Sequence, residues 1–143
     1  AMLEEAITPY RHNFQPSQYL DKPYLIVAAG VCAAKTDEEA EYLRSSQLLA
    51  FARLRTGAPG KLPKPVAGVE NHIPAQVLAQ VRQAMSCSAT GSEARVKQQL
   101  GALIEQYQPD ELMITGMIHD PAARIASFEI AAKVLKELQD TPQ

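Results

Sequence analysis

The run from Tyr24 to Ala34 limits the possible folds of this chain more than any other segment. Its residues are all apolar or small, and no polar position alternates with an apolar one. A half-exposed strand alternates with a period of two, whereas a strand that is buried on both faces reads as a continuous apolar run. We therefore expect a buried strand here, of the kind found in parallel sheets.

A second, shorter apolar run extends from Glu111 to Thr115, just before Gly116, and has the length of a strand. Helical spacing of apolar residues predicts one helix before the first run, three helices between the runs and one helix after Asp120. Parallel neighbours need connections long enough to return the chain, so this order predicts an α/β fold with two parallel strands and a mostly helical remainder.

Several local signals predict where the helices begin. Thr36 and Glu39 have the spacing of a capping box, and so do Thr90 and Glu93. Asp120 followed by Pro121 suits a helix start in which the carboxylate accepts backbone N–H groups. In the last helix we expect an apolar face, formed by Ile125, Phe128, Ala132 and Leu135.

Two segments are expected to be irregular. Residues 56–71 hold three glycines and three prolines, which predicts a long excursion that serves as a functional lid or as a mobile linker. The stretch from Ser86 to Gly91 is expected to be a break between two helices.

The charge balance argues against one class of partner. The chain has 14 lysines and arginines against 16 acidic residues, and no basic stripe that would neutralise phosphates, so we expect no nucleic-acid partner. No apolar run approaches the roughly 20 residues that cross a bilayer, so we expect no membrane partner either.

The cysteines and histidines show no metal-binding pattern. Cys32 and Cys87 have no CxxC spacing, and their use fits a reduced, cytoplasmic protein. His12, His72 and His119 lie far apart in sequence, without a carboxylate or cysteine at ligand spacing, so no metal site is expected. We also expect Ala1-Met2 to be the remnant of a tag before a chosen starting point.

Motifs that recur in one family lie in order along nearly the whole chain. They read YRHNFQPS from Tyr10, TDEEA from Thr36, LRTGAPGKLPKPV from Leu54, ATGSE from Ala89, DELMIT from Asp110, and IHD, AAR and SFE between Ile118 and Glu129. In this order and at this spacing they resemble the C-terminal part of the luciferase-like (LLM class) flavin-dependent monooxygenases, related to the alkanal monooxygenase subunits.

The resemblance implies that residues 1–143 are the C-terminal portion of a (β/α)8 barrel of the TIM type. It also implies a reaction in which reduced FMN and O2 oxidise an aldehyde or a similar small organic substrate, with a flavin reductase as partner. The related cofactor F420 is an alternative to FMN. The barrel strands that supply most flavin contacts would precede Leu3, so we expect the isolated chain to bind no cofactor tightly and to be inactive.

Active sites of such barrels gather at the carboxyl ends of the strands. This rule selects Thr115, His119, Asp120 and Arg124 as candidates for the substrate or flavin pocket. Alternatively, Asp120 only caps the helix, and His119 and Arg124 lie on the surface. The family usually has Tyr where this chain has His119, and His where it has Pro121, so no catalytic residue is assigned.

A turn at Thr90, Gly91 and Ser92 is a candidate phosphate site, because backbone N–H groups at a helix start bind anions. Helix capping explains the same residues.

Two hypotheses follow for the chain as a whole. In the first, it is part of a flavin-dependent monooxygenase and its partner is the remaining barrel. In the second, it is a non-catalytic interaction module derived from that barrel, and its exposed strand edges and apolar helix faces pair with another copy of the chain.

Overall fold

A computed structural model describes residues 2–140. In chain order its elements are α1 (Met2–His12), β1 (Ile26–Ala33), α2 (Asp37–Arg55), the 3-10 helix η1 (Val69–Asn71), α3 (Ala75–Ala84), β2 (Ser88–Gly91), α4 (Glu93–Tyr107), β3 (Glu111–Thr115) and α5 (Pro121–Asp140). Of the expected tag remnant, Ala1 lies outside the described residues, and Met2 begins α1.

The three strands form one parallel sheet in the order β2-β1-β3. The expected α/β class and the parallel arrangement are confirmed, but the count of two strands was wrong. β2 occupies the segment that was expected to be a break between helices. Its four residues include only one apolar side chain, Ala89, so its strand conformation depends on pairing with the buried β1 rather than on a pattern of its own.

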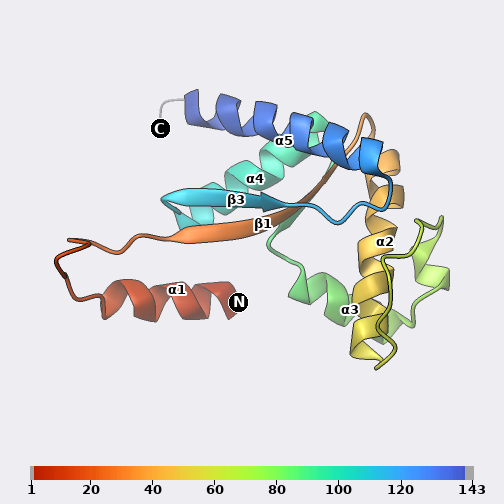
Figure 1. Cartoon of the computed structure of the whole chain (residues 1–143), viewed down its shortest axis with the longest axis horizontal. Helices are drawn as coiled ribbons and strands as arrows, with labels where there is room; N and C mark the ends of the chain where they lie inside the picture. Colours follow the sequence, from red (N-terminus) through yellow and green to blue (C-terminus); the bar gives the residue numbers. More distant parts are fainter. Residues whose placement is uncertain (1, 141–143) are drawn as a thin grey trace.

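Helices α4 and α5 run along the same face of the sheet (Figure 1). This face carries the alternate residues of each strand, and it forms the main core with the two helices. The buried residues of this core are Ala29, Val31, Ala33, Ala89, Val96, Leu100, Ala131 and Val134. Neither α4 nor α5 covers the other face of the sheet.

The buried side of α5 differs from the expected one. Ser127, Ala131 and Val134 point into the core, whereas Ile125 is 60% exposed and Phe128 is 39% exposed. The small side chains of Ser127 and Ala131 let the helix lie close to β1. The helix therefore turns its small side chains toward the sheet, because close packing against β1 leaves no room there for its large apolar side chains.

Helix α2 begins at the carboxyl ends of the strands, and α3 lies beside it (Figure 1). The predicted capping box at its start is confirmed, because the Glu39 N–H donates to Thr36 Oγ1 at 3.1 Å. The far part of α2, the irregular excursion and α3 share a second hydrophobic cluster, made of Leu48, Leu49, Ala52, Val69, Ile73, Leu78 and Val81. The excursion is fixed to α2 by a hydrogen bond of 2.8 Å from the Val66 N–H to Ser45 Oγ.

Helix α1 packs beneath the amino end of β1, where Ile7 joins Val27 and Tyr107 in a small cluster. Arg11 donates to the carbonyl oxygens of Tyr107 and Gln108 at 2.7 and 2.8 Å, which satisfies the end of α4. Among residues 2–140, no helix has the length and apolar character needed to cross a bilayer.

Candidate functional site

The sheet face opposite α4 and α5 carries most of the polar groups of the strands. Alternation along a strand and the parallel register assign one set of residues to this face, which we call the hydroxyl face. Its members are Ile26, Ala28, Gly30, Cys32, Ser88, Thr90, Glu111, Met113 and Thr115. The half nearer the carboxyl ends bears the three hydroxyls, and the other half bears exposed apolar side chains.

Gly30 lies at the centre of a row across all three strands, because it is in register with Ser88 on one side and Thr115 on the other. A methyl group placed on Gly30 would lie 3.7 Å from Ser88 Cβ and 3.9 Å from Thr115 Oγ1. Glycine therefore leaves a gap about one methyl group wide between two hydroxyl-bearing side chains. A flat group could approach the backbone at this point.

Arg44 extends from α2 onto the same face. Its Nη2 donates to Ser88 Oγ at 2.9 Å, and its Nη1 donates to Thr90 Oγ1. The side chain is half-buried, and burial lowers the pKa of the guanidinium, while the carboxylate of Glu41 opposes that shift. None of the ion pairs among the described residues includes Arg44.

The two cysteines are protonated structural residues rather than nucleophiles. Burial raises the pKa of the Cys32 thiol to about 12, and this thiol donates to the Ala40 carbonyl at 3.4 Å. Cys87 donates to the Ala28 carbonyl at 3.4 Å, and burial raises its pKa as well. Since only the thiolate attacks, neither cysteine is prepared for nucleophilic chemistry.

The four predicted pocket residues do not form one cluster. Thr115 lies on the hydroxyl face, where its hydroxyl makes a long hydrogen bond of 3.5 Å to the Ala29 carbonyl. Asp120 caps α5, because its carboxylate accepts the Ala123 N–H at 2.8 Å. His119 and Arg124 are exposed, and no hydrogen bond or ion pair joins their side chains to the rest of residues 2–140.

The predicted phosphate turn is already supplied with hydrogen-bond acceptors. The Thr90 N–H donates to Gln99 Oε1 and the Ser92 N–H donates to Asp37 Oδ1, each at 2.7 Å. The capping box expected of Thr90 and Glu93 is absent, because the N-cap of α4 is Ser92 and its side chain makes no capping hydrogen bond. A phosphate bound to these backbone groups would have to displace both oxygens.

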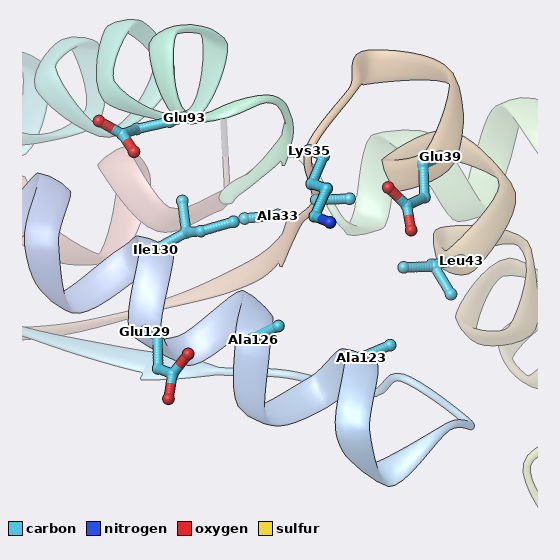
Figure 2. Close-up of a pocket in the computed structure, with 10 residues that line it drawn as sticks. Ala33, Lys35, Glu39, Leu43, Glu93, Ala123, Ala126, Glu129 and Ile130 are labelled. Atoms are coloured by element: carbon cyan, nitrogen blue, oxygen red, sulfur yellow. The ribbon is translucent and has the colours of Figure 1, made fainter.

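A cavity of about 470 Å³ opens beside the carboxyl end of β1, between α2, α4 and α5. Figure 2 shows Lys35 and Glu39 facing Ala123, Ala126 and Glu129 of α5 across it. Alanines form much of its wall, and its charged groups are Lys35, Glu39, Glu93 and Glu129. None of the predicted site residues lines this cavity.

Sequence reasoning missed Gly30, Ser88 and Arg44. A signal exists for Ser88 alone: Ser88, Ala89 and Thr90 alternate polar and apolar, which is typical of a strand with one polar face. Arg44 follows the buried Leu43 on α2, but its partners lie 44 and 46 residues away. No group of three or more His, Cys, Asp or Glu side chains within residues 2–140 is arranged to hold a metal ion.

No family model matches the chain. A luciferase-like monooxygenase of Escherichia coli (strain K12) is 39% identical over 137 residues, which are 96% of this chain and 41% of that protein. Nearly the whole chain is thus similar to part of a luciferase-like monooxygenase.

Two further matches have similar coverage. The uncharacterized protein YvbT of Bacillus subtilis (strain 168) is 34% identical over 131 residues, which are 92% of this chain and 39% of YvbT. The crystal structure of apo-MsnO8 matches with a TM-score of 0.72 and 26% identity, over 97% of this chain and 42% of that one. The chain thus spans about two fifths of the length of the curated relatives it matches.

Proposed function

We propose that this chain contributes its three parallel strands and their helices to the barrel of a flavin-dependent monooxygenase. In the proposed reaction, O2 and reduced FMN oxidise an aldehyde or a similar small organic substrate. The observation that carries the proposal is the 39% identity with a luciferase-like monooxygenase over 137 residues. The remaining barrel would be the partner of this chain, and a flavin reductase would supply reduced FMN in the cytoplasm.

The arrangement of β1, β3, α4 and α5 supports this proposal. In a (β/α)8 barrel the strands are parallel, the helices lie outside, and the other face of the sheet points inward. Here β1 and β3 are parallel neighbours, and α4 and α5 cover one face only. The hydroxyl face would then be the inner face of the wall, and Thr115 would lie at its catalytic end.

The residues of the hydroxyl face fit a flat, polar cofactor. The gap at Gly30 admits a planar ring close to the backbone, and the hydroxyls of Ser88 and Thr115 flank it. When bound, reduced flavin supplies the electrons that reduce O2, and the protein positions the ring and excludes water. We propose FMN rather than F420, because a monooxygenase needs a reduced ring that reacts with O2.

His119 is the group of this chain best suited to move a proton in such a site. It follows β3 at the carboxyl end of the sheet, and the two nitrogens of an imidazole can donate and accept a proton. Arg124, one turn into α5, would attract anionic groups to the same end. Asp120 is assigned to capping alone, because its carboxylate already accepts the Ala123 N–H.

Flavin titration tests the proposal at two lengths of chain. We expect the 143-residue chain to show no micromolar FMN binding in fluorescence quenching or calorimetry. A longer protein that adds about two hundred residues before Leu3, the extra length expected of a typical full barrel, is expected to bind FMN and to consume O2 with an aldehyde. A longer protein that folds but binds no flavin contradicts the proposed function, and tight binding to the short chain contradicts the partial site.

A second candidate function is a non-catalytic module that associates with its own copies. The observation that favours it is the exposure of Ile26 and Met113 on the hydroxyl face, 51% and 55% respectively. An apolar sheet face with unpaired strand edges would pair with another copy if no barrel covered it.

A further inference from the structure

Arg44 has a chemistry that the proposed oxidation does not use. We propose that Arg44, together with Ser88 and Thr90, forms an anion site that takes a phosphate group. This site lies where α2 crosses the carboxyl half of β2, and it involves different atoms from the backbone turn at residues 90–92. The inference does not rest on the proposed function.

The hydrogen bonds around Arg44 leave donors for a ligand. Ser88 donates its hydroxyl proton to the Met85 carbonyl at 2.6 Å and accepts from Arg44, so it has no proton left for a ligand. The Thr90 hydroxyl accepts from Arg44, but its own proton has no acceptor among residues 2–140. A guanidinium also has more N–H groups than the two that are used here. Thr90 and Arg44 can therefore donate together to one oxyanion.

The charges around Arg44 make an anion favourable. A half-buried cation without a carboxylate partner keeps the cost of its desolvation, and a bound anion would offset that cost. Glu41 is the acidic group that acts on Arg44, but its carboxylate is shared with Arg95, at 3.8 Å. Arg82 of α3 adds a second positive charge that acts on Arg44.

Phosphate suits these groups better than a carboxylate does. The positive charges of Arg44 and Arg82 repel each other, so a ligand with more than one negative charge is favoured. A phosphate monoester carries such a charge near neutral pH. A phosphate also presents three oxygens to donors that come from different directions, whereas a carboxylate presents two. Hydrogen bonds to Ser88 and Thr90 hold the Arg44 guanidinium in one orientation, so this planar group is ordered before a ligand binds.

Calorimetric titration of the 143-residue chain with inorganic phosphate at low salt tests the site. We expect saturable millimolar binding that Arg44→Met weakens at least about tenfold, since charge-assisted hydrogen bonds to phosphate are lost. Thr90→Val is expected to weaken binding by a smaller factor. The matched control is Arg55→Met, which removes an exposed arginine from the end of the same helix.

A measurement on the unchanged protein covers the case in which Arg44→Met fails to fold. The side-chain N–H signal of Arg44 in a two-dimensional NMR spectrum is expected to shift with the same phosphate dependence as the heat signal. The proposal is overturned if phosphate leaves this signal in place, or if the folded Arg44→Met chain binds as tightly as the original. Acetate binding of equal strength would also overturn it, because the site would then select carboxylates.

Discussion

Ser127 joins α5 to the sheet through a single buried contact. Its Oγ accepts the Ala33 N–H at 2.8 Å, and the residue is 2% exposed. Ala33 is the last residue of β1, so without Ser127 its N–H would have neither a strand partner nor water. This hydrogen bond therefore fixes the distance between α5 and the end of β1.

We expect Ser127→Ala to lower the free energy of unfolding by about 1–3 kcal/mol, the cost of one buried unsatisfied donor. Urea unfolding followed by circular dichroism measures the change. Ser86→Ala is the matched control, because Ser86 is exposed and its side chain makes no hydrogen bond. Equal stability of the two variants would show that the Ala33 N–H finds another partner.

Asp37 gives the chain a dependence of stability on pH. The backbone N–H of Ser92 donates to this carboxylate, which holds its pKa below the ordinary value of 3.8. A lowered pKa in the folded state means that the stabilisation is complete above that ordinary value, and that it is lost as the pH falls through the folded pKa.

We expect Asp37→Asn to lower the stability near pH 7 and to differ less from the original chain below about pH 3.8, where the carboxyl of the unfolded chain is protonated. Urea unfolding at a series of pH values measures this. Asp21→Asn serves as control, because Asp21 is exposed and its side chain makes no hydrogen bond or ion pair with the rest of residues 2–140. A stability difference that stays constant with pH would assign the effect of Asp37 to shape rather than to charge.

Single residues were predictable from sequence where their partners are close in the chain. Thr36 and Asp120 cap helices through residues three positions ahead, so the local spacing was sufficient. Thr90 was wrongly expected to cap α4: the N-cap residue is Ser92, and its N–H donates to Asp37, which lies 55 residues away in the chain. A contact of that kind needs the fold to be known first, and the partners of Arg44 belong to the same class.

Among the elements, β2 shows why short strands escape detection. It contributes four residues, and Gly91 at its end has a φ of 145°, which other residues rarely adopt. The pattern of small residues around it suits a turn as well as a strand. What makes it a strand is the ladder to β1, from Gly30 to Ala33, and no local pattern records that ladder.

We expect Gly91→Ala to destabilise the chain by at least about 1 kcal/mol, because the new methyl group adds a clash to a strained backbone. It would lie 2.7 Å from both Arg95 Cδ and Asp37 Oδ1. Gly60→Ala is the control, since a methyl group there meets nothing within 4 Å. Thermal unfolding of both variants decides the matter, and equal midpoints would mean that the β2 end rearranges freely.

At the scale of the whole molecule, the sheet is covered by a helical layer on one face and bears exposed Ile26 and Met113 on the other. If nothing else covers this surface, we expect the 143-residue chain to associate as its concentration rises. Sedimentation velocity measures the association. The double variant Ile26→Gln, Met113→Gln is expected to move the chain toward the monomer.

The control for this prediction is Leu54→Gln, which changes a leucine that is 60% exposed on α2, away from the sheet. A chain that stays monomeric at all concentrations would contradict the association and the second candidate function with it. It would leave the monooxygenase proposal to the flavin titration.

The overall class was predictable because buried strands have a distinctive composition. The run around β1 and the shorter run at β3 indicated parallel strands, and the ordered motifs indicated the family. The hydroxyl face was not predictable, because it arises only when the register sets Gly30 beside Ser88 and Thr115. Register is a property of the assembled sheet, and it depends on how α4 and α5 fill the opposite face.

Helix α2 connects two hydrophobic clusters that share no residue. Its first turns join Cys32, Ala34 and Ile118 near the strands, and its last turns meet Val69, Ile73 and α3. Such a division lets the distal half open while the strands stay paired, so the two halves need not melt at the same free energy. Amide protons of α3 would then exchange with solvent sooner than those of β1, because the distal half of α2 and α3 would open without separating the strands.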